Sequence, residues 1–173
     1  METKPLGMDW TKKDTVKSVL LFLLHFIILV TLAAGILLGD KTSHLVEYMR
    51  ENGAYYLYAF LCVMMLVVIT YLCFFFEDRE VLKKASRICI LFVALDLHFL
   101  AAWLTGDKIH IYARPVAFLP LMIFLLINRR AAIFMNVIGS LFVFVTDVFT
   151  GSIVALHFEY YSSLIISFSA GMF

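Results

Sequence analysis

The stretch from Tyr112 to Asn136, YARPVAFLPLMIFLLINRRAAIFMN, limits most strongly what this chain can fold into. An apolar segment that contains two prolines leads through a tight Asn-Arg-Arg turn straight into a second apolar segment. This pattern is typical of a hairpin of two membrane helices. Short loops rich in Lys and Arg stay on the cytoplasmic side, so the double arginine at Arg129 and Arg130 orients the hairpin and, with it, the rest of the chain.

The composition places the whole chain in the same class. Of its 173 residues, 63% are hydrophobic and only 16% are charged, whereas a water-soluble domain has about a quarter of its residues charged. The chain is therefore predicted to be an all-α integral membrane protein whose first partner is the lipid bilayer. Its basic residues stand at the ends of apolar runs and form no continuous face, which excludes a nucleic-acid-binding surface.

We predict a bundle of about six transmembrane helices with short loops, which follows a cytoplasmic N-terminal segment of residues 1–17. The membrane domain is residues 18–173, with spans at 18–39, 55–76, 88–104, 111–127, 131–149 and 160–173. The first span is longer than the core of a signal peptide, so we expect it to be retained. The last would reach only roughly 21 Å, so we expect the chain to be part of a larger protein.

The distribution of basic residues predicts the topology. Alternate sides of the six-span layout carry ten and four of the 14 Lys and Arg residues. The positive-inside rule then places the N-terminus and, after six crossings, the C-terminus in the cytoplasm.

Ionisable residues inside the spans are the candidate ligand or proton sites, because burying them in lipid costs a few kcal/mol. Asp96 lies near the middle of the third span, and His25 is the strongly polar group of the first. His98 follows Asp96 by two positions, about 200° around a helix, so these two side chains cannot share a face. Two interpretations of Asp96 stay open: a group that only fixes helix packing, and a ligand or proton site.

Arg114 and Asp147 form the second candidate site. In the predicted topology both lie near the outer surface, where they could form an ion pair next to His110, His157 and Glu159. His and carboxylate side chains are suitable ligands for a metal, but their spacing here fits no metal motif, and interfacial solvation of the charges is the alternative.

Two prolines shape the fourth span. Pro115 fits the first turn of a helix, whereas Pro120 should kink the helix or restart it. Kinked helices line substrate sites in transporters and also occur as plain packing features. Gly35 and Gly39 form a GxxxG pair in the first span, which allows close approach of another helix and suggests possible self-association.

Motifs for catalysis, cofactors or resident metals are absent from the sequence. There is no Gly-rich phosphate loop, no HExxH, no GxSxG and no His-Asp dipeptide. We therefore expect this chain not to be an enzyme by itself.

The segment from Tyr112 to Val145 resembles the membrane region of the bacterial seven-transmembrane HD family. The features that match are Tyr112 with Pro115-Val116-Ala117, then Pro120 and Met122, then the turn of residues 128–132, Asn-Arg-Arg-Ala-Ala, and finally residues 169–171, Ser-Ala-Gly. Members of that family join a multi-helix membrane domain to a cytoplasmic HD phosphohydrolase that degrades cyclic di-AMP. The resemblance covers about Tyr55 to Phe173 and implies a sensory and anchoring module in the bacterial inner membrane that works with a cytoplasmic catalytic domain.

The chain departs from the family pattern in two ways. Only residues 40–54 stand where family members carry a large extracellular domain, and the HD metal ligands would lie beyond Phe173. Two other functions remain open. The length and the segment VTDVFTG, residues 145–151, are similar to the rod-shape scaffold protein MreD. The kinked fourth span, Asp96 and His25 instead suit a small transporter or substrate-binding membrane subunit.

Overall fold

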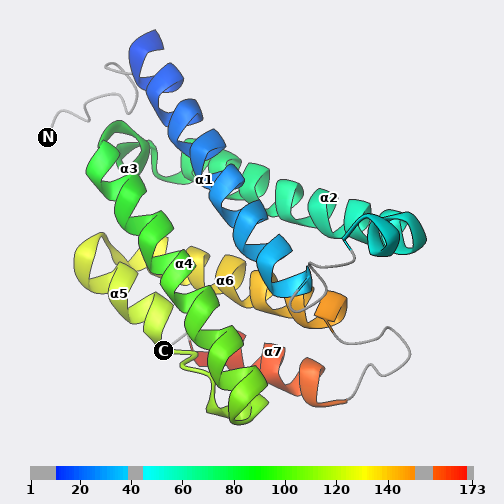
Figure 1. Cartoon of the computed structure of the whole chain (residues 1–173). Helices are drawn as coiled ribbons and strands as arrows, with labels where there is room; N and C mark the ends of the chain where they lie inside the picture. The colour runs from blue at the N-terminus through cyan, green and yellow to red at the C-terminus, as the bar shows by residue number, and fades with distance from the viewer. Residues whose placement is uncertain (1–10, 39–44, 151–157, 171–173) are drawn as a thin grey trace, which may run out of the picture.

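The computed structural model describes residues 11–38, 45–150 and 158–170, and every regular element within them is helical (Figure 1). In chain order the elements are α1 (Lys12–Leu38), α2 (Leu45–Glu77), α3 (Arg79–Lys83), α4 (Ala85–Lys108), the short 3-10 helix η2 (Ile111–Ala113), α5 (Phe118–Leu126), α6 (Arg129–Thr150) and α7 (Phe158–Ala170). The predicted class, an all-α bundle of apolar helices, is confirmed.

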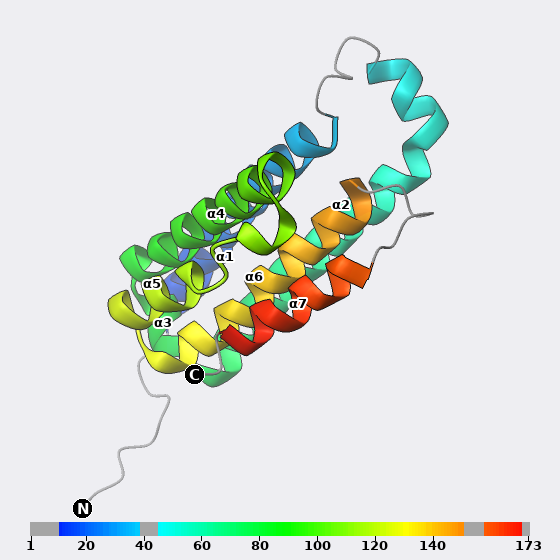
Figure 2. The same cartoon turned by 90° about the horizontal axis from the view of Figure 1, so that it is seen from below.

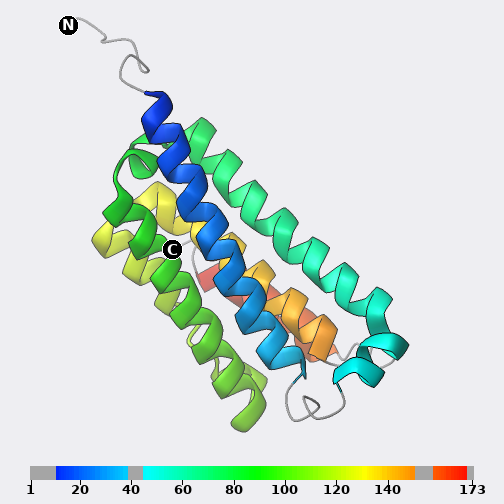
Figure 3. The same cartoon turned by 45° about the horizontal axis from the view of Figure 1, so that its top comes forward.

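Helix α6 is the centre of the bundle, because it contacts α1, α2, α4, α5 and α7. Helices α1, α2, α4 and α6 run the length of the molecule, and α5 and α7 lie alongside α6 (Figures 2 and 3). Helix α7 is antiparallel to α6: the Asn136 side chain bonds backbone oxygens of residues 167 and 168, and the rings of Phe144 and Tyr161 are 5.9 Å apart. The end of α7 therefore returns to the end of the bundle where α6 begins.

The bundle differs from a soluble protein in that its outer surface is apolar as well as its core. A continuous core joins α1, α2, α4, α5 and α6 through residues such as Leu29, Leu91 and Met135, which are at most 1% exposed. The outer surface is equally apolar: Leu23 and Leu24 on α1 are each 56% exposed, and Leu125 on α5 is 74% exposed. Such an apolar exterior is stable only where something other than water covers it, as the acyl chains of a bilayer do.

The prediction of about six spans is wrong in its number. Within the described ranges four helices, α1, α2, α4 and α6, are long and apolar enough to cross a membrane, and two further apolar helices are shorter. The predicted span 111–127 is divided into η2, a bend and turn at residues 114–117, and the nine residues of α5, which rise only about 14 Å. The predicted span 160–173 is α7, which has 13 residues.

Proline chemistry explains the break in the fourth segment. Arg114, before Pro115, has extended backbone angles (φ −62°, ψ 136°), as expected for a residue that precedes proline. The helix restarts at Phe118, so Pro120 falls in its first turn, where a missing N–H leaves no helical hydrogen bond unmade. Of the two outcomes expected at Pro120, a kink or a restart, the structure has a helix that begins two residues earlier, at Phe118.

Some predicted boundaries also shift. Helix α1 begins at Lys12, inside the segment predicted to precede the membrane domain, because Thr11 and Asp14 form a reciprocal capping box, with Asp14 N–H to Thr11 Oγ1 3.3 Å and Thr11 N–H to Asp14 Oδ2 3.2 Å. Helix α2 begins at Leu45, within the predicted 40–54 loop, and the short α3 lies in the predicted 77–87 loop. No atom from another part of the described chain lies within 4 Å of a Cβ built on Gly35, and Gly39 is outside the described residues.

Candidate functional site

Arg114 and Asp147 form a buried two-point ion pair. Arg114 Nη1 lies 2.6 Å from Asp147 Oδ2, and Nη2 lies 2.6 Å from Oδ1. The side chains are only 7% and 11% exposed. Two parallel charge-assisted bonds fix both distance and orientation, so the pair predicted from the sequence exists and fastens the segment before α5 to the far end of α6.

The surroundings of Arg114 make this pair a clamp. Arg114 Nε donates to the carbonyl oxygen of Ala102 on α4 at 3.2 Å. Gly106, one turn further, leaves room for the guanidinium group, because a Cβ there would lie 2.6 Å from Arg114 Nε. The space beside the pair, lined by Phe99, Trp103 and other α4 and α6 residues, is about 10 Å³, at most the volume of one water. The geometry favours a structural clamp over a ligand site.

His25 and Asp96 meet at the midplane of the bundle. His25 is the middle residue of α1, and Asp96 is halfway along α4. His25 Nδ1 lies 3.7 Å from Asp96 Oδ2, and the side chains are 3% and 19% exposed. That distance is too long for a hydrogen bond, and a closing movement of about 1 Å between α1 and α4 would form one.

The His25–Asp96 site has unused bonding capacity. Neither ring nitrogen of His25 nor Oδ1 of Asp96 has a hydrogen-bond partner among the described residues. The imidazole stacks on Phe92 of α4 with ring centres 3.8 Å apart and planes 2° apart. Buried polar groups without partners are uncommon and mark candidate functional positions.

His98 faces another part of the molecule. Its side chain is 5% exposed and lies beside α6, where a Cβ on Gly139 would be 3.4 Å from His98 Cδ2. Asp96 faces α1, so the prediction that these two α4 residues point to different sides is confirmed. His98 Nδ1 has no hydrogen-bond partner among the described residues.

A third polar contact holds the opposite end of α5. Asn128 Nδ2 donates to Asp78 Oδ2 at 2.7 Å, and Asn128 Oδ1 accepts from the Ala131 N–H at 2.7 Å. Asn128 thus caps the start of α6 and links it to the end of α2. Sequence reasoning treated this residue only as part of a turn, although a cap residue ahead of an apolar run was a usable signal.

Two further contacts fasten α7. Asn136 Nδ2 donates to the Ser167 carbonyl oxygen at 2.9 Å, and Tyr112 Oη lies 2.6 Å from Ser162 Oγ. Asn136 was missed by the sequence reasoning, although an amide inside an apolar run is costly without a partner and could have been noted.

The predicted polar cluster around Arg114 is present only in part. His110 is exposed and stacks on Tyr112 with ring centres 5.3 Å apart. His157 and the side chain of Glu159 lie outside the described residues. Among the residues that are described, no three His, Cys, Asp or Glu side chains are placed to hold a metal ion.

Known proteins provide no further identification of this chain. No family model, curated protein or solved structure matches it.

Proposed function

We propose that this chain is a membrane-embedded sensory and anchoring module of the kind found in the bacterial seven-transmembrane HD family, with no catalytic site of its own. The observation that carries the proposal is the position of the residues that resemble the family. Arg114 precedes Pro115-Val116-Ala117, and Asn128 begins the Asn-Arg-Arg-Ala-Ala turn. These two residues make the contacts that fasten the two ends of α5.

In this arrangement, the segment that resembles the family holds α5 in place between its neighbours. A helix of nine residues is too short to hold its place by its own length. Arg114 binds it to α4 and α6, and Asn128 binds it to the end of α2. Helices α4, α5 and α6 therefore form a fixed frame, against which another helix can move.

Helix α1 is the element that we propose to move. Its midpoint contact with α4, between His25 and Asp96, is not closed in this structure. A proton on His25 with a charged Asp96 would attract across 3.7 Å, and neutral groups would not. A change in charge state or a ligand outside the membrane could thus shift α1, and the shift could pass along α4 and α6 to a cytoplasmic partner.

The orientation of the module follows from its charges. The start of α1, helix α3, the start of α4 and the start of α6 share one end of the bundle (Figures 1 and 2). This end carries Lys12, Lys13, Lys17, Arg79, Lys83, Lys84, Arg87, Arg129 and Arg130. By the positive-inside rule we propose that this end faces the bacterial cytoplasm, with both termini on that side.

The first test is to sequence the source DNA past the codon for Phe173. We expect an open frame that encodes a soluble region with a His-Asp pair and further metal-ligand histidines. We also expect deletion of the gene to raise cellular cyclic di-AMP. A stop codon after Phe173, or an unchanged cyclic di-AMP level with altered cell shape, would reject the proposal in favour of an MreD-like scaffold.

One observation favours a second candidate, a small proton-coupled transporter. His25 and Asp96 at the bundle midplane, whose ring nitrogens and Oδ1 have no hydrogen-bond partner among the described residues, are the type of groups that carry protons in such proteins. Purified chain in liposomes with a pH gradient would separate the two functions. Proton flux that Asp96→Asn abolishes would support transport, and no flux above that of empty liposomes would exclude proton movement by this chain.

A further inference from the structure

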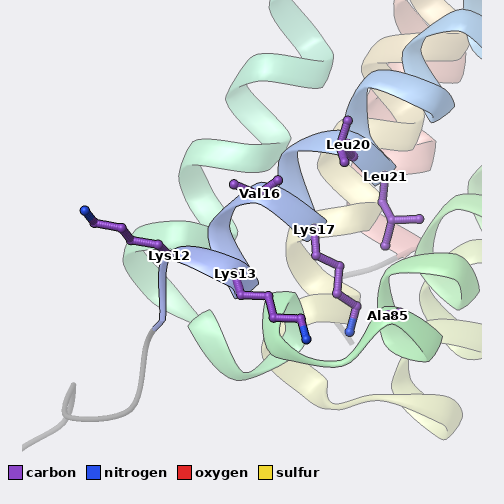
Figure 4. A pocket seen from close by; sticks show the side chains of 7 residues that line it. All are labelled: Lys12, Lys13, Val16, Lys17, Leu20, Leu21 and Ala85. Atoms are coloured by element: carbon purple, nitrogen blue, oxygen red, sulfur yellow. The ribbon is translucent and has the colours of Figure 1, made fainter.

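The basic end of the bundle contains an open groove between α1 and the start of α4. Its volume is about 570 Å³, and it lies beside Ala85, the first residue of α4. Three lysines of the first α1 turns line it, Lys12, Lys13 and Lys17, together with the apolar side chains of Val16, Leu20 and Leu21 (Figure 4). The groove itself is therefore lined by hydrocarbon, the stems of the lysines included, and the ammonium groups stand at its edge.

Two of the lysines converge. Lys13 and Lys17 are one helical turn apart, and their side chains extend toward the same place beside Ala85, whereas Lys12 points away (Figure 4). Like charges four residues apart on a helix repel each other. Asp14 is the acidic residue of this turn, and its carboxylate accepts the N–H and the hydroxyl of Thr11 at 3.2 and 2.7 Å. It therefore offsets the charge of the lysines only in part.

The apolar part of the groove continues into the outer surface of α1. Leu20 is 58% exposed and Val16 is 58% exposed, and Leu23 and Leu24 extend the same exposed apolar surface deeper along the helix. The groove therefore passes from an ammonium pair at the helix start to surface that acyl chains would cover. Basic pockets between membrane helices on the cytoplasmic side are suited to anionic lipid headgroups.

We propose that this groove binds one anionic glycerophospholipid, with its phosphate between the ammonium groups of Lys13 and Lys17 and an acyl chain along Val16, Leu20 and Leu21. The phosphate relieves the repulsion between the two lysines, and the acyl chain covers apolar surface. The proposal concerns lipid binding and does not depend on the proposed sensory function.

The test uses the full chain purified in detergent and measures lipid adducts by native mass spectrometry. The probes are phosphatidylglycerol and phosphatidylcholine with identical acyl chains. We expect phosphatidylglycerol to bind the wild-type chain more tightly. Lys13→Gln with Lys17→Gln should weaken that binding about ten- to thirty-fold, since each lysine near a membrane surface contributes about 1 kcal/mol. Binding of phosphatidylcholine should stay the same.

Arg129→Gln with Arg130→Gln is the matched control, because it removes two charges from the same end of the bundle and does not touch the groove. We expect less than about a twofold change in phosphatidylglycerol binding from this control. Equal weakening by both double variants would overturn the proposal, since it would reduce the effect to net charge.

Two further measurements decide the outcome if the glutamine variant does not fold. Lys13→Arg with Lys17→Arg keeps both charges and should retain preferential phosphatidylglycerol binding, and its loss would contradict charge recognition at this groove. Soluble glycerol phosphate at the same concentration should not compete with the lipid. Competition by it would assign the site to a free phosphate, and equal binding of both lipids by the wild type would leave no headgroup site; either result overturns the proposal.

Discussion

The two buried ionic sites of this bundle differ in how completely their bonding groups are used. Arg114 and Asp147 meet through two bonds of 2.6 Å, and Arg114 Nε has a third acceptor in Ala102. His25 and Asp96 stand 3.7 Å apart, and three of their polar atoms have no partner among the described residues. The first site thus has its charged groups bonded, and the second leaves bonding groups of α1 and α4 unused.

This difference suggests a structural role for the first pair and a signalling role for the second. A satisfied buried pair is costly to break and has one geometry. A pair just beyond bonding distance needs only a small movement to close, and a change in its charge changes the attraction that would close it. We therefore assign the Arg114–Asp147 pair to the frame of α4, α5 and α6, and the His25–Asp96 pair to the movable contact of α1.

Loss of the clamp should have the largest effect on stability. Arg114→Ala removes both 2.6 Å bonds to the buried Asp147 carboxylate, so we expect the free energy of unfolding to fall by roughly 3–5 kcal/mol. The measurement is unfolding of the purified chain in mixed micelles, followed by loss of helical circular dichroism.

A double variant tests whether the charges of the two side chains or only their volumes contribute to the free energy of unfolding. Arg114→Met with Asp147→Leu removes both charges and should recover most of the lost stability. A loss below about 1 kcal/mol from Arg114→Ala would show that the clamp is weak, and the contrast between the two sites would disappear.

The close contact of α5 with α6 predicts the next largest effect. A Cβ on Gly139 would collide with the Leu119 side chain, and it would also approach His98. We expect Gly139→Val to cost about 1–3 kcal/mol of unfolding free energy through overpacking. Gly35→Val on α1 is the control, because a Cβ there meets nothing within 4 Å. Equal losses at both glycines would contradict a rigid frame beside a looser α1.

The N-caps of α6 and α1 should differ in the same direction, with smaller losses of unfolding free energy. Asn128→Ala removes the cap of α6 and the bond to Asp78, so we expect a loss of about 1–2 kcal/mol. Thr11→Ala breaks an exposed capping box that involves α1 alone, and we expect about 0.5–1 kcal/mol. Thermal unfolding of the two variants under identical conditions makes the comparison, and a larger loss at Thr11 would reverse it.

The sequence predicts the frame better than it predicts the movable site. Charges at the ends of apolar runs led to the Arg114–Asp147 pair, because both positions fall at the same depth once the hairpin is placed. The His25–Asp96 contact depends on how α1 and α4 are rotated toward each other. That rotation is set by packing of many apolar side chains, and both helices are apolar on every side.

The predicted number of spans was wrong for a related reason. Apolar length alone cannot distinguish one straight helix from a 3-10 turn, a β-turn and a short helix in series. Pro115 and Pro120 indicated a break, but they did not show that Phe118 would begin a separate helix. The bond between Asn128 and Asp78 was equally hidden, since the two residues are 50 positions apart.

The most direct test of the account is the cellular level of cyclic di-AMP in the source organism carrying Asp96→Asn. The substitution breaks no hydrogen bond among the described residues, so we expect unchanged stability and membrane abundance. We expect a changed cyclic di-AMP level, because an amide cannot form the ion pair with a protonated His25. An unchanged level at equal abundance would contradict it and would leave Asp96 a packing residue.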